Sequence, residues 1–229
     1  MREKKRFFNT LAAVSLLAFT GEAFGAMITV GTEVSASGVN SWTGAENPSF
    51  AIDGLGQNYL NFGEVNTGVL VTPAYGSSIV TRLSIWTAND AVESDPASYQ
   101  VLGTNSAIGA GPYDSSLFTM ISQGAVSLPS SRNSNGSSFL LPENSFTVSF
   151  SNANAFTSYL ILFPTVKDEA AADGMQVAEI ELFEGSNPVL AFGDTIAGVQ
   201  ADAAIVPEPS TGALALLSLA GLALRRRRS

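Results

Sequence analysis

The sequence predicts an all-β protein whose single globular domain is an antiparallel β-sandwich. Short runs rich in Val, Ile, Leu, Phe and Tyr recur along the chain, and most of them alternate apolar with polar residues. Clusters of Gly, Pro, Asn, Asp and Ser separate the runs, and no long helical pattern interrupts them. Many short strands at even spacing are typical of a sandwich.

Six runs carry this prediction. The clearest is "QVAEIELFE" (176–184), in which Val177, Ile180 and Leu182 alternate with polar residues. The others are "LSIWTAN" (83–89), "SYQVLGTN" (98–105), "LFTMIS" (117–122), "SFTVSF" (145–150) and "SYLILF" (158–163).

Residues 1–25 have the three parts of a secretory signal peptide. A basic start is followed by the apolar stretch 11–19, and Ala23-Phe24-Gly25 fits a small-x-small cleavage site. An N-terminal membrane anchor is the alternative, but the apolar stretch is too short to span a bilayer. We therefore expect signal peptidase to cleave after Gly25.

The other end of the chain, 206–229, combines a turn, an apolar run and a basic cluster. Pro207, Glu208 and Pro209 precede the uncharged segment 211–224. The last part is a cluster of four arginines, Arg225, Arg226, Arg227 and Arg228. The segment is shorter than the ~20 residues of a full membrane span. It is also apolar on every face, so a soluble domain would have to bury it whole.

This ending resembles the PEP-CTERM sorting signal of Gram-negative bacteria, with all three parts in order at the terminus. The resemblance implies recognition by an exosortase and transient anchoring in the inner membrane through the helix 211–224. Processing near the Pro-Glu-Pro motif and delivery to the cell surface or extracellular matrix would follow.

The charge of the part between the two signals excludes some functions. Residues 27–206 contain three bases, Arg82, Arg132 and Lys167, against 17 acids. Such a domain repels nucleic acid and attracts cations, calcium above all. The chain has no His and no Cys, which leaves carboxylate chemistry or no chemistry.

Three landmarks resemble discoidin-like, galactose-binding-like domains: "NPSFAIDGLGQNYLNFG" (47–63), "YQVLGTN" (99–105) and "QVAEIELFE". The resemblance implies a jelly-roll β-sandwich over 26–185 whose loops at one end bind glycans. Asn58 and Leu60 stand where many relatives have Thr and Trp. Residues 186–205 are interpreted as a linker, with a decayed second repeat as the alternative.

The Asp-Gly loop is the candidate metal site. Asp53 would supply one carboxylate, Gly54 and Gly56 permit tight curvature, and the resemblance places Glu179 of the closing strand against the loop. Calcium is the expected cofactor. The alternative is that Asp53 caps a turn and that Glu179 is a solvated strand residue.

Candidate glycan-binding residues are three aromatic side chains and one base. Trp42, Tyr75 and Tyr113 lie in turn-rich segments, where an exposed ring can cover the apolar face of a sugar. Arg132 would grip a carboxylated glycan, or else form a local ion pair. A further acidic group, Asp90, Glu93 and Asp95, is better explained by turn chemistry than by a cation site or a glycosidase pair.

Three functions remain open at this point. The first is an exported, non-catalytic module that binds glycan or exopolysaccharide. The second is a structural matrix protein without a discrete ligand, and the third is a carboxylate-dependent glycoside hydrolase. We expect the first, with no catalytic residues and no nucleic-acid partner.

Overall fold

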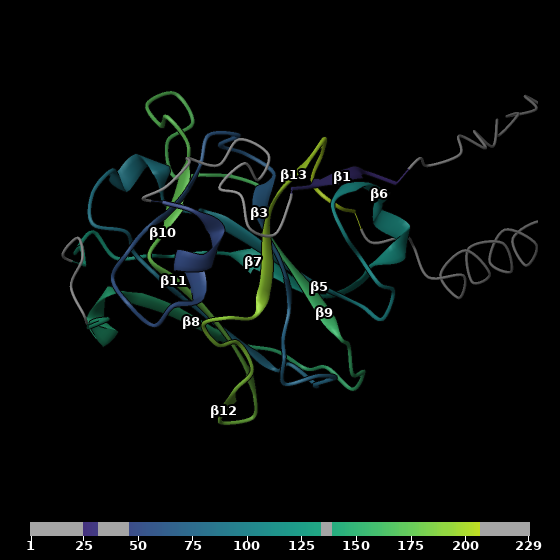
Figure 1. Cartoon of the computed structure of the whole chain (residues 1–229). Helices are drawn as coiled ribbons and strands as arrows, with labels where there is room; N and C mark the ends of the chain where they lie inside the picture. The colour runs from purple at the N-terminus through teal and green to yellow at the C-terminus, as the bar shows by residue number, and fades with distance from the viewer. Residues whose placement is uncertain (1–24, 32–45, 134–138, 207–229) are drawn as a thin grey trace, which may run out of the picture.

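The computed structural model describes residues 25–31, 46–133 and 139–206 (Figure 1), and every strand pair in these residues is antiparallel. The larger sheet has seven strands in the order β6-β1-β13-β3-β9-β5-β7. Its strands are β1 (Met27–Val30), β3 (Thr67–Thr72), β5 (Ser98–Thr104), β6 (Gly111–Asp114), β7 (Thr119–Ala125), β9 (Ser158–Phe163) and β13 (Thr195–Ala201). The predicted antiparallel β-sandwich is confirmed.

A four-stranded sheet packs against this one, in the order β12-β11-β4-β8, and a two-stranded ribbon β10-β2 lies beside them. These strands are β2 (Tyr59–Asn61), β4 (Arg82–Trp86), β8 (Ser145–Ser149), β10 (Met175–Val177), β11 (Glu179–Glu184) and β12 (Asn187–Pro188). Four single-turn 3-10 helices complete the described residues: η1 (Pro48–Ile52), η2 (Val92–Ser94), η3 (Ser115–Leu117) and η4 (Pro142–Asn144). The predicted strand 176–184 is divided at Ala178 into β10 and β11.

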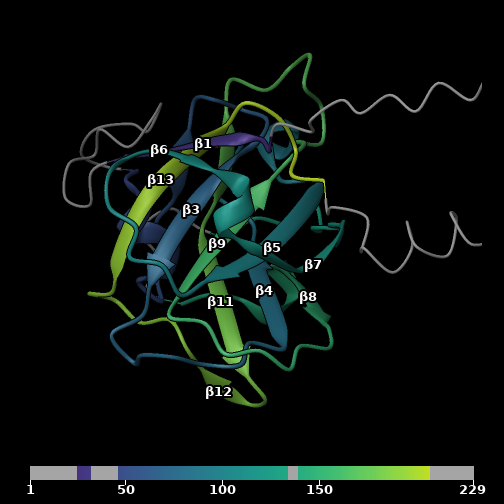
Figure 2. The ribbon, with the colours of Figure 1, turned by 90° about the vertical axis from the view of Figure 1, so that its right-hand side faces the viewer.

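The core lies on both faces of the larger sheet, and β9 shows why. All six residues of β9 are buried. Tyr159, Ile161 and Phe163 point into the main core between the two sheets. Leu160 and Leu162 point to the opposite face, where a second apolar cluster includes Phe118 and Ile205. A strand that is covered on both faces needs a continuous apolar run, and "YLILF" supplies one. Figure 2 shows β9 between β3 and β5 in this sheet.

The predicted linker 186–205 is wrong. Its residues form β12 and β13, and β13 pairs with both β1 and β3 inside the larger sheet. Ile196, Val199 and Ala201 are buried there. The run "TIAGVQA" contains small residues and a glycine, so its sequence gives little indication of a strand. The strand gains most of its stability from its neighbours in the sheet. The domain therefore extends to about residue 206, and 26–206 contains every described strand of both sheets.

The loops gather at two opposite ends of the sandwich. The acidic end consists of 46–58, 87–97, 126–133 and 164–174, which hold eight carboxylates. The neutral end consists of 73–79, 105–110, 150–157 and 185–194. In Figure 1, β12 at the bottom of the view marks the neutral end. Of the residues that the structure describes, none forms a helix long and apolar enough to cross a membrane.

Candidate functional site

The Asp-Gly loop meets the first residue of β11 at the acidic end. The helix η1 begins after Asn47, whose side chain accepts a hydrogen bond from the Ser49 N–H (3.0 Å), and it ends at Asp53. Gly54 follows with φ +73°, a left-handed conformation that suits glycine. Its N–H donates to Glu179 Oε2 at 2.9 Å, while Asp53 Oδ1 accepts from the Leu55 N–H at 2.8 Å. The structure therefore brings Asp53 and Glu179 together, and Glu179 is 3% exposed rather than solvated.

The electrostatics of this pair are unusual for an acidic protein. Burial raises the pKa of Glu179 to about 9, the Gly54 N–H lowers it, and the nearby carboxylates of Asp53 and Glu181 raise it further. Burial also raises the pKa of Asp53, against the opposing hydrogen bond from Leu55. No basic side chain of the described residues is among the groups that act on Glu179. A buried carboxyl in this situation takes up either a proton or a cation.

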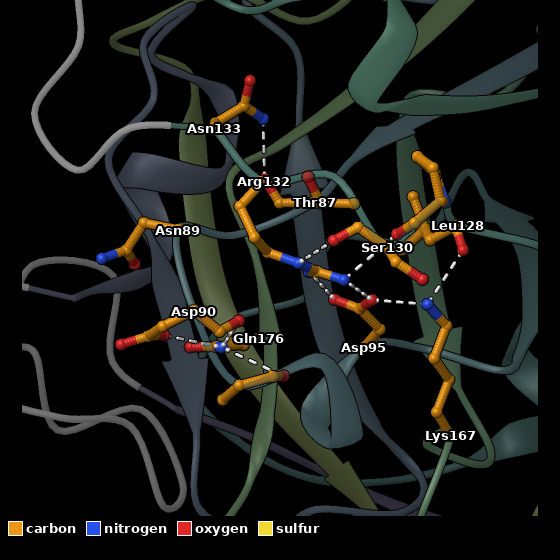
Figure 3. A network of polar contacts seen from close by, with 12 residues as sticks. Thr87, Asn89, Asp90, Asp95, Leu128, Ser130, Arg132, Asn133, Lys167 and Gln176 are labelled. Atoms are coloured by element: carbon orange, nitrogen blue, oxygen red, sulfur yellow. Dashed lines mark hydrogen bonds and ion pairs between the residues drawn. The ribbon is translucent and has the colours of Figure 1, made fainter.

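The bases of the domain are engaged elsewhere, chiefly around Asp95, whose side chain is fully buried (Figure 3). Arg132 donates to both carboxylate oxygens of Asp95, from Nη1 to Oδ1 and from Nη2 to Oδ2, each at 2.7 Å. Lys167 Nζ lies 2.7 Å from Oδ2 and also donates to the Leu128 carbonyl at 2.8 Å. The third base, Arg82, lies 3.8 Å from the centre of the Phe183 ring.

This arrangement changes the interpretation of two predictions. Arg132 forms a buried ion pair, so its guanidinium is not free to grip a glycan in this structure. Asp95 is held by two cations, which removes it from any pair of catalytic carboxylates. The ion pairs instead join three loops of the acidic end, because Asp95, Arg132 and Lys167 come from separate segments.

Amide side chains form a second polar group at the same end, and the sequence analysis did not identify it. Asn58 donates to the Asn89 side chain, and Gln176 Nε2 donates to the Asp90 carbonyl (2.8 Å) and Oδ1 (3.0 Å). Asn133 Nδ2 donates to the Thr87 carbonyl at 2.7 Å, as Figure 3 shows. The available signal was the polar sequence that directly follows β4.

Asn144 belongs to the same group, because its Nδ2 donates to Asn133 Oδ1 at 3.1 Å, and two amides of the group have an oxygen without a partner. Asn58 Oδ1 and Asn144 Oδ1 are buried and accept no hydrogen bond from the described residues. A buried acceptor of this kind carries a desolvation cost until a donor reaches it. The acidic end thus retains capacity to bind hydroxyl or water hydrogens.

The predicted aromatic residues do not converge on one place. Tyr75 lies at the neutral end and is 64% exposed. Tyr113 lies on the edge strand β6, packs against the second apolar cluster and accepts a hydrogen bond from the Gly109 N–H (3.1 Å). Trp42 and the sorting residues 207–228 lie outside the described residues. Tyr75, Tyr113 and Arg132 therefore lie apart in the structure, and the role of each in ligand binding stays a prediction.

Comparison with known proteins identifies the C-terminal signal. Residues 206–228 match the family model described as the PEP-CTERM protein-sorting motif. The chain is thus a protein with an export and sorting signal that follows an antiparallel β-sandwich. No curated protein matches the sequence.

Solved structures of similar shape include three carbohydrate-binding modules. Chitosan-binding module 1 of a chitosanase/glucanase from Paenibacillus sp. IK-5 is 13% identical, with a TM-score of 0.41 over 70% of this chain and 96% of that one. The family 32 module of Clostridium perfringens NanJ, solved with galactose, is 14% identical (TM-score 0.40, 69% and 97%). A module from C. perfringens GH89, solved with GalNAc-β-1,3-galactose, is 19% identical (0.38, 69% and 94%). At these values the site must be argued from this chain alone.

We expect Arg132→Ala to lower the free energy of unfolding by about 3 kcal/mol, because it removes the bidentate partner of a buried carboxylate. Chemical denaturation at pH 7 measures this loss. Arg132→Lys is the matched control: it keeps the charge without the planar fork, so its loss should be smaller. Equal stability of wild type and Arg132→Ala would contradict the structural role of the ion pair.

Glu179 should also make the metal-free domain sensitive to pH. Its folded pKa is above its unfolded value, so the folded state binds the proton more tightly, and stability falls as pH rises from about 5 to about 9. The contribution is at most about 1.4 kcal/mol per pH unit. We expect Glu179→Gln, measured in chelator, to flatten this slope, whereas Glu143→Gln at an exposed position leaves it unchanged. Parallel slopes for wild type and Glu179→Gln would show that Glu179 titrates normally.

Proposed function

We propose that this protein is an exported, exosortase-processed component of the cell surface or extracellular matrix whose domain binds glycan without catalysis. Signal peptidase would remove residues 1–25, and the membrane would hold the chain through 211–224 until processing. The sorting motif at 206–228 supports the export route. The sequence supplies neither His nor Cys, and Asp95 is neutralised by two cations, which favours binding over hydrolysis.

The observation that carries the binding role is the gathering of amide groups at the acidic end. Planar amides hydrogen-bond the hydroxyl pairs of sugars, and loops held on a rigid sandwich can present them without reorganisation. Asn89 is partly exposed, and Asn58 beneath it has an oxygen without a partner. The ion pairs around Asp95 fix the neighbouring loops, which favours a preorganised surface.

Calcium is part of the same proposal. Asp53 and Glu179 offer two hard carboxylates, and Glu179 is buried without a basic partner among the described residues, so a divalent cation would neutralise it. Among the same residues no group of three or more Asp or Glu side chains forms a metal cage. The remaining ligands would therefore be backbone carbonyls of the loop or water, both of which calcium accepts. The pair fits such an ion, whose bound role would be to fix the loop rather than to take part in chemistry.

Calcium should raise the melting temperature of residues 26–206 in high sodium, because it binds the folded state far better than the unfolded chain. The gain in free energy follows RT ln(1 + [L]/Kd), about 2.7 kcal/mol at a hundredfold excess over Kd. Magnesium should help less, since it requires tighter octahedral geometry. Asp53→Asn removes one charge of many, so it preserves general screening but should abolish the specific response. Identical calcium responses in wild type and Asp53→Asn would show that the loop is only a turn.

Glycan binding is tested with an array of bacterial and host glycans probed with residues 26–206. We expect at least one positive glycan, and about a tenfold or greater loss of affinity in Asn89→Ala, the value that corresponds to one lost hydrogen bond to a polar ligand. Tyr75→Ala at the opposite end is the matched control and should bind normally. Binding that depends on Tyr75 and not on Asn89 would place the glycan site at the neutral end and contradict the proposal. An array with no positive glycan would favour the structural matrix role.

A further inference from the structure

Two aromatic rings project from neighbouring turns at the neutral end. Tyr75 is 64% exposed and Phe192 is 70% exposed. Each is followed by a glycine with positive φ, Gly76 at +94° and Gly193 at +97°, which sets the shape of its turn. Both rings are thus presented outward by turns that a side chain at the glycine would strain.

One carboxylate ties these two turns together. Asp194 Oδ1 accepts from the Ala74 N–H and Asp194 Oδ2 accepts from the Ala191 N–H, both at 2.9 Å. Thr195 pairs with Thr72 directly below, so the two turns continue adjacent strands of the larger sheet. Because the cross-link is made by backbone N–H groups and one side chain, the turns that carry Tyr75 and Phe192 are held in fixed relative positions.

The charge of this surface differs from that of the rest of the domain. Within its four segments, 73–79, 105–110, 150–157 and 185–194, Asp194 is the single charged residue, and its carboxylate already accepts two hydrogen bonds. The acidic end, by contrast, holds eight carboxylates and two bases. Absence of charge together with exposed aromatic rings is the composition of the centre of a protein–protein interface.

Two amide side chains of the neutral end bind backbone groups of its own loops. Asn105 donates to the Ala155 carbonyl (3.1 Å) and accepts from the Thr157 N–H (2.9 Å). Asn152 donates to the carbonyls of Val80 (3.1 Å) and Asn154 (2.9 Å). These planar amides therefore hold the loops of the neutral end in place.

We propose that the neutral end is a self-association surface, on which Tyr75 and Phe192 of one molecule pack against the same residues of a second copy. Two copies of an acidic domain repel each other at any contact that brings their carboxylates close. A contact between two neutral ends points the two acidic ends outward, in opposite directions. The acidic ends are then two domain lengths apart, which exceeds the ~8 Å screening length of physiological salt. The described chain begins at Gly25 and ends at Val206, which line one pocket beside Leu102, Phe118 and Met120, outside the four segments of the neutral end.

This inference goes beyond the proposed function, because it concerns the end opposite to the amide group. A symmetric contact of this kind would convert one glycan-binding domain into a two-headed particle with binding loops at both tips. Such a particle can bridge two polymer chains, and its avidity depends on the geometry of the contact.

Sedimentation equilibrium of residues 26–206, from about 10 µM to about 1 mM, tests the proposal over the range of weak interfaces. We expect the mass to rise toward that of a dimer, and more steeply when sodium chloride is added, because salt screens the repulsion between acidic domains without weakening an uncharged contact. Phe192→Glu should keep the protein monomeric throughout. Phe139→Glu is the matched control, because Phe139 is 77% exposed but lies outside the neutral end.

Three results would overturn the proposal: a monomer at every concentration in high salt, association that salt weakens, or equal association of wild type and Phe192→Glu. Chemical shift mapping with a neutral polysaccharide, hydroxyethyl cellulose, gives a further check. If that polymer perturbs Tyr75 and Phe192 while the protein stays monomeric, the surface binds glycan and not a second copy. Loss of glycan binding in Asn89→Ala tests the acidic end, so failure of one proposal is distinguishable from failure of the other.

Discussion

The shortage of basic side chains determines how this domain compensates its buried carboxylates. Residues 27–206 hold three bases against 17 acids, and two of those bases are used on a single carboxylate, that of Asp95. An isolated charge cannot be buried without compensation, so this allocation fixes Asp95 inside the loops it joins. It also leaves Glu179, which is buried at the start of β11, with backbone N–H groups as its donors. The same shortage explains why the two ends of the sandwich differ.

The acidic end has two parts: loops that are cross-linked by ion pairs and amide hydrogen bonds, and carboxyl groups that have no basic partner among the described residues. The ion pairs of Asp95 and the amide bonds around Asn133 and Gln176 hold the loops without any disulfide, since the chain has no Cys. Beside them, burial also raises the pKa of Glu46, and the charge of Asp90 adds to this effect. Carboxylates that lie near one another without bases depend on protons or on external cations. This is the physical reason for the proposed calcium site, because calcium is a hard cation that accepts carboxylate oxygens.

The fold class could be predicted from the sequence, whereas the domain boundary and much of the candidate site could not. Alternating runs such as "EIELFE" predicted strands because one face of each is buried. The apolar run "SYLILF" predicted a strand as well, and the structure places it between β3 and β5. The strand β13 was concealed because Gly198 and the small residues around it gave little pattern, although Ile196 and Val199 are buried by their neighbours. The contact between Glu179 and the Asp-Gly loop was expected from resemblance, since residues so far apart in sequence reveal no spacing.

Other parts of the site depend on tertiary structure alone. Arg132 and Asp95 are separated by 37 residues and meet only after the loops fold. The sequence therefore predicted a glycan contact or a local ion pair for Arg132, and not a pair with this distant carboxylate. Tyr75 and Tyr113 lie in similar turn-rich contexts, but one is at the neutral end and the other on an edge strand. The neutral end could not be predicted from the sequence, because only the folded chain brings its four segments together on one surface. Each segment alone looks like an ordinary turn.

No basic side chain of the described residues neutralises Glu179. The most direct measurement is the carbon-13 NMR titration of the Glu179 carboxyl in residues 26–206, with and without calcium. We expect a carboxyl that is protonated at pH 7 in chelator, with a pKa of about 9, and that becomes ionised at the same pH when calcium is added. A carboxyl that is already ionised at pH 7 in chelator, and whose resonance calcium leaves unchanged, would contradict it.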